Sequence, residues 1–284
     1  MDGNLERTAM LRLKRTAENL QKNGMETHIL QRREEVVPWL KSFIPEGAAV
    51  AHGGSMTLSE CGVIDLLKTG HYRYIDRDRE GITPEERVEA MREALLSDVY
   101  LLSANALIEN GMIYNVDGNG NRTAASLYGP RKVVYVIGEN KLVPDFDAAV
   151  SRVKRTACPA NTMRLSCETY CASKGLCVAS DKGITEGCGG SSICNEHVLI
   201  RRNNIPGRVV VLLVRERLGY WWTVVLSRYS LAAPAHEAGA ALVCRKSFFK
   251  YILGAAHPSL SVAKLWTASE VRKVSAWEGA LPLP

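Results

Sequence analysis

The sequence of 284 residues is 46% hydrophobic and carries a formal net charge of +6, an ordinary balance for a globular chain. Residues 1–220 contribute +2 of this charge and residues 221–284 contribute +4, so the main body has too little positive charge for a nucleic-acid surface. The chain starts without an apolar signal core and has no run of 18 apolar residues, so we expect a cytoplasmic protein without membrane contact.

Hydrophobic periodicity predicts helices and strands that alternate along most of the chain. The predicted helices lie at residues 5–23, 34–43, 55–67, 83–96 and 145–156, and another begins near residue 160, after Pro159 breaks the preceding one. Short apolar runs predict strands at residues 26–30, 48–51, 72–75, 98–102, 132–137, 197–202 and 208–214. This alternation predicts an α/β fold with a mostly parallel sheet flanked by helices.

A glycine turn joins the strand at residues 48–51 to the helix that follows it. The turn reads Gly53-Gly54-Ser55-Met56-Thr57. Glycines let the backbone approach a ligand closely, and the free N–H groups at a helix start attract an anion. We therefore expect Gly53, Gly54, Ser55 and Thr57 to hold a phosphate or carboxylate group. A tight turn with an ordinary helix cap is the alternative.

The stretch 103–141 is rich in polar side chains and is bracketed by two apolar strand runs, a common setting for ligand-binding groups in α/β proteins. The candidate ligand-binding residues are Asn105, Asp117, Asn121, Arg122 and Lys141. Arg122 can grip a carboxylate through two hydrogen bonds. Glu109 is the candidate general base, because a partly dry cleft can raise the pKa of a carboxyl group toward neutrality. A solvated hairpin with turns at residues 110–111 and 117–118 is the alternative.

Five of the eight cysteines lie within residues 167–194. Four of them follow the spacing C-x5-C-x10-C-x5-C: Cys171, Cys177, Cys188 and Cys194. In a cytoplasmic protein such cysteines are more typical of metal ligands or free thiols than of disulfides, and thiolates bind zinc or iron–sulfur clusters. Redox-active thiols and partly buried structural cysteines are the alternatives. Cys61, Cys158 and Cys244 are interpreted as buried or incidental.

Several motifs follow one another in order: Gly53-Gly54-Ser55, Ser103-Ala104-Asn105-Ala106, Asn115-Val116-Asp117-Gly118, Gly120-Asn121-Arg122 and Gly138-Glu139-Asn140-Lys141. Together they resemble the signatures of the LUD (lactate-utilisation) domain family, to which LutC of bacterial lactate oxidation is related. The resemblance implies a LUD domain over residues 1–220, including the cysteine-rich loop 167–194, and a fold like that of ribose-5-phosphate isomerases and CoA transferases. Residues 221–284 would be a C-terminal extension.

The resemblance also implies a function, namely support of L-lactate oxidation to pyruvate by binding a small anionic metabolite or cofactor in a cleft. Side chains do not transfer a hydride, so electrons would pass through the cysteine site or a separate iron–sulfur or flavin subunit. Fold analogy favours a second hypothesis, an isomerase or CoA/acyl transferase that uses Glu109 or Asp117. A non-catalytic module that senses a ligand or the redox state is the third.

Overall fold

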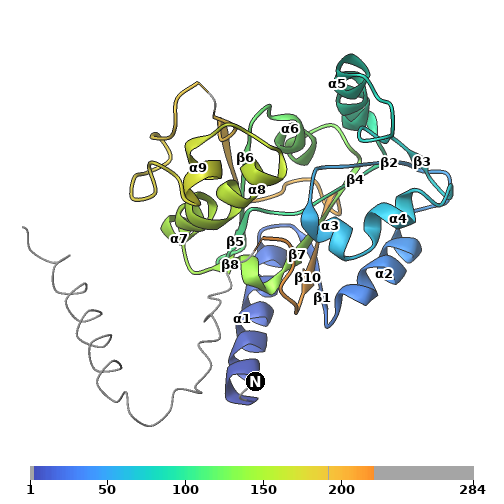
Figure 1. Cartoon of the computed structure of the whole chain (residues 1–284). Coiled ribbons are helices and arrows are strands. Elements are labelled where there is room, and N and C mark those ends of the chain that lie inside the picture. The colour runs from blue at the N-terminus through green and yellow to red at the C-terminus, as the bar shows by residue number, and fades with distance from the viewer. Residues whose placement is uncertain (1–2, 191, 221–284) are drawn as a thin grey trace, which may run out of the picture. The chain divides into compact units, whose positions relative to one another are not determined.

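The computed structural model describes residues 3–190 and 192–220, and the predicted extension at residues 221–284 lies outside them. Two β-sheets and the helices packed on them make up this part of the chain (Figure 1). Among its helices, none combines the length and the apolar character that are needed to cross a bilayer.

The larger sheet has six strands, and all its pairings are parallel. Their spatial order is β1 (Glu26–Leu30), β10 (Val209–Val214), β7 (Lys132–Gly138), β4 (Val99–Leu102), β2 (Ala49–His52) and β3 (Arg73–Tyr74). In β10, Val210 lies opposite both Glu26 and Val134. All six residues of β10 are buried, as expected for an apolar strand covered on both faces. The predicted mostly parallel α/β sheet is confirmed.

Helices cover both faces of this sheet. One face carries α1 (Gly3–Lys22), α5 (Pro84–Glu93) and α6 (Asn121–Leu127), and the other carries α2 (Val36–Phe43), α3 (Met56–Glu60) and α4 (Val63–Leu67). Leu20 and Ala90 share one buried core with Tyr135, whereas Leu40 shares the opposite core with Leu212. The alternation of side chains along each strand thus supplies two cores.

The smaller sheet has the order β8 (Leu142–Val143), β5 (Ala106–Ile108), β6 (Met112–Asp117) and β9 (Glu196–Ile200). β5 and β6 form an antiparallel hairpin that turns at Asn110 and Gly111, as the alternative interpretation expected. Gly111 has a φ of +84°, and a Cβ there would lie 2.7 Å from the backbone of α1. The strand predicted at residues 197–202 belongs to this sheet, antiparallel to β6, and not to the larger one.

Helices α7 (Phe146–Arg152), α8 (Cys158–Arg164) and α9 (Tyr170–Lys174) lie together beside the smaller sheet (Figure 1). A π-helical segment, Val153–Ala157, connects α7 directly to α8. The predicted helix break at Pro159 is therefore wrong. Pro159 is the second residue of α8, directly after the π-helical segment, where the change in hydrogen-bond pattern accommodates a residue without an N–H group.

Two other helices differ from expectation. The helix predicted over residues 55–67 is divided at Gly62, whose φ of +70° is left-handed and ends α3 before α4 begins. The helix α6 is not predicted, because three residues before it, Gly118 to Gly120, are typical of a turn. Short 3-10 helical turns lie at Arg33–Glu35, Ala94–Leu96 and Glu139–Lys141.

Candidate functional site

A pocket of about 300 Å³ lies at the carboxyl ends of the parallel strands. Ser55 follows β2, Arg77 follows β3, Asn105 follows β4 and Lys141 follows β7, so four strands deliver residues to it. Parallel sheets commonly bind ligands at this edge, because the loops there converge while the strands hold their ends rigidly.

The structure brings most of the predicted ligand-binding residues to this one pocket. Its lining includes Gly54, Ser55, Thr57, Asn105, Asp117, Asn121, Arg122 and Lys141. Gly53 lies just behind the wall, where a Cβ would come within 2.8 Å of the Arg122 side chain. Ser55 also caps α3, because its Oγ accepts a hydrogen bond from Leu58 N at 3.3 Å. The glycine turn and the polar stretch are thus adjacent, although about 50 residues separate them in the sequence.

Lys141 is buried at the base of the pocket. Its Nζ donates to Thr57 Oγ1 at 2.8 Å and to Ser103 Oγ at 2.7 Å. Burial, followed by the positive charges of Arg152 and Arg122, lowers the pKa of Lys141 well below its usual value. The backbone at Gly219 lies against this amine, since a Cβ there would be 3.5 Å from Nζ. Lys141 is therefore an amine that lacks a carboxylate partner among the described residues.

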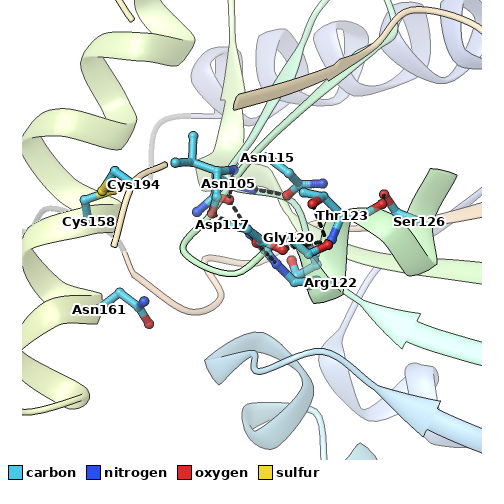
Figure 2. Close-up of polar contacts among 12 residues, drawn as sticks. Asn105, Asn115, Asp117, Gly120, Arg122, Thr123, Ser126, Cys158, Asn161 and Cys194 are labelled. Carbon is cyan, nitrogen blue, oxygen red and sulfur yellow. Dashed lines mark hydrogen bonds and ion pairs between the residues drawn. The ribbon is translucent and has the colours of Figure 1, made fainter. Parts of the chain in front are cut away.

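Arg122 holds the floor of the pocket together. Its guanidinium donates to Asp117 Oδ1, to Asn105 Oδ1 at 2.8 Å, and to the carbonyl oxygens of Ser103 and Val116 (Figure 2). The second Asp117 oxygen accepts a hydrogen bond from Thr123 N at the start of α6. Most N–H groups of Arg122 are therefore used within the protein. The expected two-bond grip of Arg122 on a ligand carboxylate has few donors left for it.

Two further arginines extend over the opposite side of the pocket. A Cβ at Gly54 would lie 2.8 Å from Arg77 Nη2 and 3.7 Å from Arg164 Nη2, so both guanidinium groups converge on this glycine. Arg164 is oriented by Asn161 Oδ1 at 2.8 Å and by the Tyr220 hydroxyl at 2.8 Å. The side chain of Arg77 is only 12% exposed, although its charged sequence segment is typical of a solvated loop.

Arg152, like Arg77, is an arginine that the sequence does not single out, whereas the spacing of Asn161 and Arg164 predicts that Arg164 could reach the ligand-binding stretch or pair with an acid. Its guanidinium donates to the carbonyl oxygens of Asn105, Asn140 and Tyr220, and burial lowers its pKa to about 10. Among the described residues, neither Arg152 nor Arg164 has a carboxylate partner. The side chains lining the pocket include six basic groups and one carboxylate, Asp117. Asp78, which is outside this lining, pairs with Arg87 at 2.7 Å and lies 3.5 Å from Arg77. Basic groups still outnumber carboxylates around the pocket, which favours an anionic ligand.

Glu109 lies away from the pocket, at the tip of the β5–β6 hairpin. Arg12 Nη2 donates to one carboxylate oxygen at 2.6 Å, and Arg15 donates to the other. Burial alone would raise the pKa of Glu109, but the hydrogen bonds and charges of Arg12 and Arg15 outweigh it and lower that pKa. The expected raised pKa is therefore not found, and Glu109 does not reach the ligand-binding candidates.

The predicted metal ligands border a second cavity of about 340 Å³. Cys158, Cys171, Cys177, Cys188 and Cys194 line it. Among the described residues, no three His, Cys, Asp or Glu side chains converge closely enough to hold an ion. Cys171 instead lies beside two threonine hydroxyls, Thr169 at 3.3 Å and Thr162 at 3.4 Å. The metal-binding role of Cys171, Cys177, Cys188 and Cys194 stays a prediction.

Cys158 is in contact with Cys194, which changes the interpretation of Cys158 as buried or incidental. Their sulfur atoms are 3.1 Å apart, so Cys158 is not incidental. Hydrogen bonding to Cys158 and the nearby charge of Lys154 lower the pKa of Cys194, while the same hydrogen bond and burial raise the pKa of Cys158. The Lys154 ammonium is enclosed by four carbonyl oxygens of the loop 179–186, which it holds beside the cavity.

A family model described as the LUD domain matches residues 13–214. Among solved structures, a duf162 family protein from Deinococcus radiodurans is similar at 14% identity and a TM-score of 0.41, over 72% of this chain and 98% of that one. The structure of eIF2B delta from Chaetomium thermophilum is similar at 16% identity and a TM-score of 0.27, over 39% of this chain and 48% of that one. No curated protein gives a significant match. The family model spans most of the two sheets and of the pocket, and the chain therefore belongs to the LUD-domain family.

Proposed function

We propose that the pocket binds a small carboxylate metabolite, lactate or pyruvate, and that the protein supports lactate oxidation. The observation that supports this proposal is the excess of basic groups. Arg77 and Arg164 approach Gly54, Lys141 lines the same pocket, and Asp117, the carboxylate in the lining, is already paired with Arg122. Two guanidinium groups that approach the same point repel each other, and the Asp78 carboxylate, 3.5 Å from Arg77, offsets only part of this repulsion. A bound carboxylate would offset that repulsion and accept charge-assisted hydrogen bonds.

The size of the pocket favours a small metabolite. A cavity of about 300 Å³ is at the lower end of the range of small-molecule sites. Its polar groups come mainly from rigid strand ends and from α8, so they are positioned before a ligand arrives. The LUD domain suggests lactate utilisation, and a three-carbon hydroxy or oxo acid suits both the charge and the volume.

Oxidation of lactate needs an electron carrier, because protein side chains do not accept a hydride. We assign this carrier to a partner subunit that contains a flavin or an iron–sulfur cluster, with the present chain binding the acid. Single-turnover mixing of the purified protein with lactate and an artificial electron acceptor distinguishes a chain that oxidises lactate alone from one that needs a redox partner subunit. No turnover is expected without the partner, and turnover by the chain alone would contradict the accessory role.

Binding is tested directly by isothermal titration with lactate and pyruvate. Arg164→Gln and Arg77→Gln each remove one charged donor near Gly54 and are expected to weaken binding roughly tenfold or more. Arg79→Gln is the matched control, because Arg79 lies in the same loop segment as Arg77, is about half exposed and pairs with Glu86. Equal affinities of the Arg164→Gln variant and the unmodified protein would contradict the proposed site.

A further inference from the structure

A dithiol pair lies in the wall between the two cavities. Cys158 lines both the pocket and the cysteine cavity, and its neighbour Cys194 lines the cysteine cavity. Figure 2 shows the two side chains next to each other, and their sulfur atoms are 3.1 Å apart. Both residues are only partly buried. A disulfide needs sulfur atoms about 2.05 Å apart, so closing the bond takes a movement of roughly 1 Å. The remaining three cysteines of the cavity have no such sulfur–sulfur contact among the described residues.

Each cysteine of the pair is attached to a different side of the pocket. Cys158 opens α8, the helix that also carries Asn161 and Arg164 into the pocket. Cys194 belongs to the segment on the other side, where Asn195 N donates to Asp117 O at 2.8 Å. The Asn195 side chain makes a second bond to the same strand end, because Nδ2 donates to Gly118 O at 3.0 Å. A covalent bond between the two sulfurs would fix the distance between the arginine side and the aspartate side of the pocket.

We propose that Cys158 and Cys194 form a reversible disulfide by exchange with an external disulfide of low molecular mass, such as oxidised glutathione. The thiolate of one cysteine attacks the external disulfide and releases one glutathione thiol. The second cysteine then displaces the other glutathione, so two protein thiols become one disulfide and two glutathione thiols are produced. Disulfides that form in cytosolic proteins are usually transient and redox-active, which fits a pair beside a ligand pocket.

The effect on the pocket rests on the proposed function. With the disulfide closed, α8 is tied to residues 193–195, and Ile193 from that segment also lines the pocket. Arg164 can then adjust less to a bound acid, so the oxidised and reduced forms differ in their affinity for pyruvate. The oxidised form binds pyruvate more tightly if closing the disulfide moves Arg164 toward the acid, and less tightly if it moves Arg164 away.

The test uses the full chain, purified without oxygen and equilibrated in glutathione buffers of several reduced-to-oxidised ratios. Free thiols are then alkylated, and peptides are mapped by mass spectrometry. We expect a peptide pair linked through Cys158 and Cys194, with a mass lower by two hydrogen atoms, that disappears on reduction. Cys158→Ser and Cys194→Ser are each expected to remove it. Cys167→Ser is the control, since Cys167 does not line the cavity.

Three results would overturn the disulfide: no linked peptides at any ratio, a bond that joins other cysteines, or a stoichiometric metal that both serine variants release. Pyruvate titration of the fully reduced and fully oxidised forms then tests the coupling. Different dissociation constants support it, and equal ones overturn it. Failure of both forms to bind pyruvate would overturn the proposed function but not the mapped disulfide, so the two ideas fail separately.

Discussion

The Lys141 amine gives the pocket a dependence on pH. Burial lowers the pKa of Lys141 in the free protein, so this amine loses its proton at a lower pH than an ordinary lysine does. A bound carboxylate favours the charged form and raises that pKa, so binding takes up a proton. Affinity should therefore rise as the pH falls through the range between the bound and free pKa values, by at most about tenfold per pH unit, and level off below it.

Lys141→Met should remove this pH dependence as well as part of the affinity. Proton uptake is measured by titrating pyruvate in buffers of different ionisation enthalpy. Lys68→Met is the matched control, because Lys68 is exposed at the end of α4 and lies outside the pocket. Proton uptake that persists in the Lys141→Met variant would assign the titration to another group.

The two neighbouring glycines should respond differently to alanine. At Gly54 the new Cβ meets Arg77 Nη2 at 2.8 Å, the far end of a flexible side chain that can move away. At Gly53 it meets Arg122 Cγ at 2.8 Å and Cδ at 2.9 Å, in a side chain held by Asp117. Gly53→Ala should therefore lower the free energy of unfolding by about 1–3 kcal/mol, whereas Gly54→Ala should mainly weaken pyruvate binding. Chemical denaturation and titration of both variants measure the contrast, and equal stability losses would contradict it.

At the scale of elements, Glu109 joins the β5–β6 hairpin to α1. Besides the two arginine contacts, Asn19 Nδ2 donates to Glu109 O at 2.8 Å, so side chain and backbone are both tied to the helix. Glu109→Gln should cost about 1 kcal/mol at neutral pH, because the arginines are partly exposed and water screens the pair. Pyruvate affinity should not change, since the hairpin tip is outside the pocket.

The same pair predicts an acid effect. The folded-state pKa of Glu109 is lowered, so its stabilisation is present above the ordinary range of glutamate and is lost as the pH falls through the folded value. Denaturation at several pH values should show this loss in the unmodified protein and not in Glu109→Gln. Glu89→Gln is the control, because Glu89 and Arg92 form an exposed pair. Loss of pyruvate binding in the Glu109→Gln variant would contradict the placement of Glu109 outside the ligand-binding site.

Sequence patterns predict most strands because buried parallel strands are continuous apolar runs, as in β7 and β10. The same patterns do not predict α6, because the glycine directly before it, Gly120, is typical of a turn. The glycine turn and the polar stretch were expected to share one ligand, and the fold does place them together. Arg77, Arg152 and the Cys158–Cys194 contact were missed, because they depend on distant segments meeting. A run of charges or a cysteine spacing describes neighbours in the sequence and does not predict which side chains face a cavity in the folded protein.

At the scale of the whole molecule, the described residues, 3–190 and 192–220, belong to one compact unit. A chain that ends at Thr223 keeps Gly219 and Tyr220, whose backbone contacts Arg152 and the base of the pocket. It should unfold in one cooperative transition and bind pyruvate as the full chain does. A chain that ends at Gly207 lacks β10 and should not fold. Calorimetry measures the unfolding of both truncated chains. Non-cooperative unfolding of the chain that ends at Thr223 would contradict an independently folding domain.

The place of β10 has a consequence for synthesis on the ribosome. Among the strands of the described residues, β10 is the last to be translated, yet it lies between β1 and β7, which have no direct pairing with each other. Until Val214 has emerged, the edges of β1 and β7 that β10 will join are unpaired, and unpaired strand edges promote association between chains. The sheet therefore closes only after nearly all of the described domain has been made, and its inner strand edges stay unpaired for longer than in a chain that adds strands in spatial order.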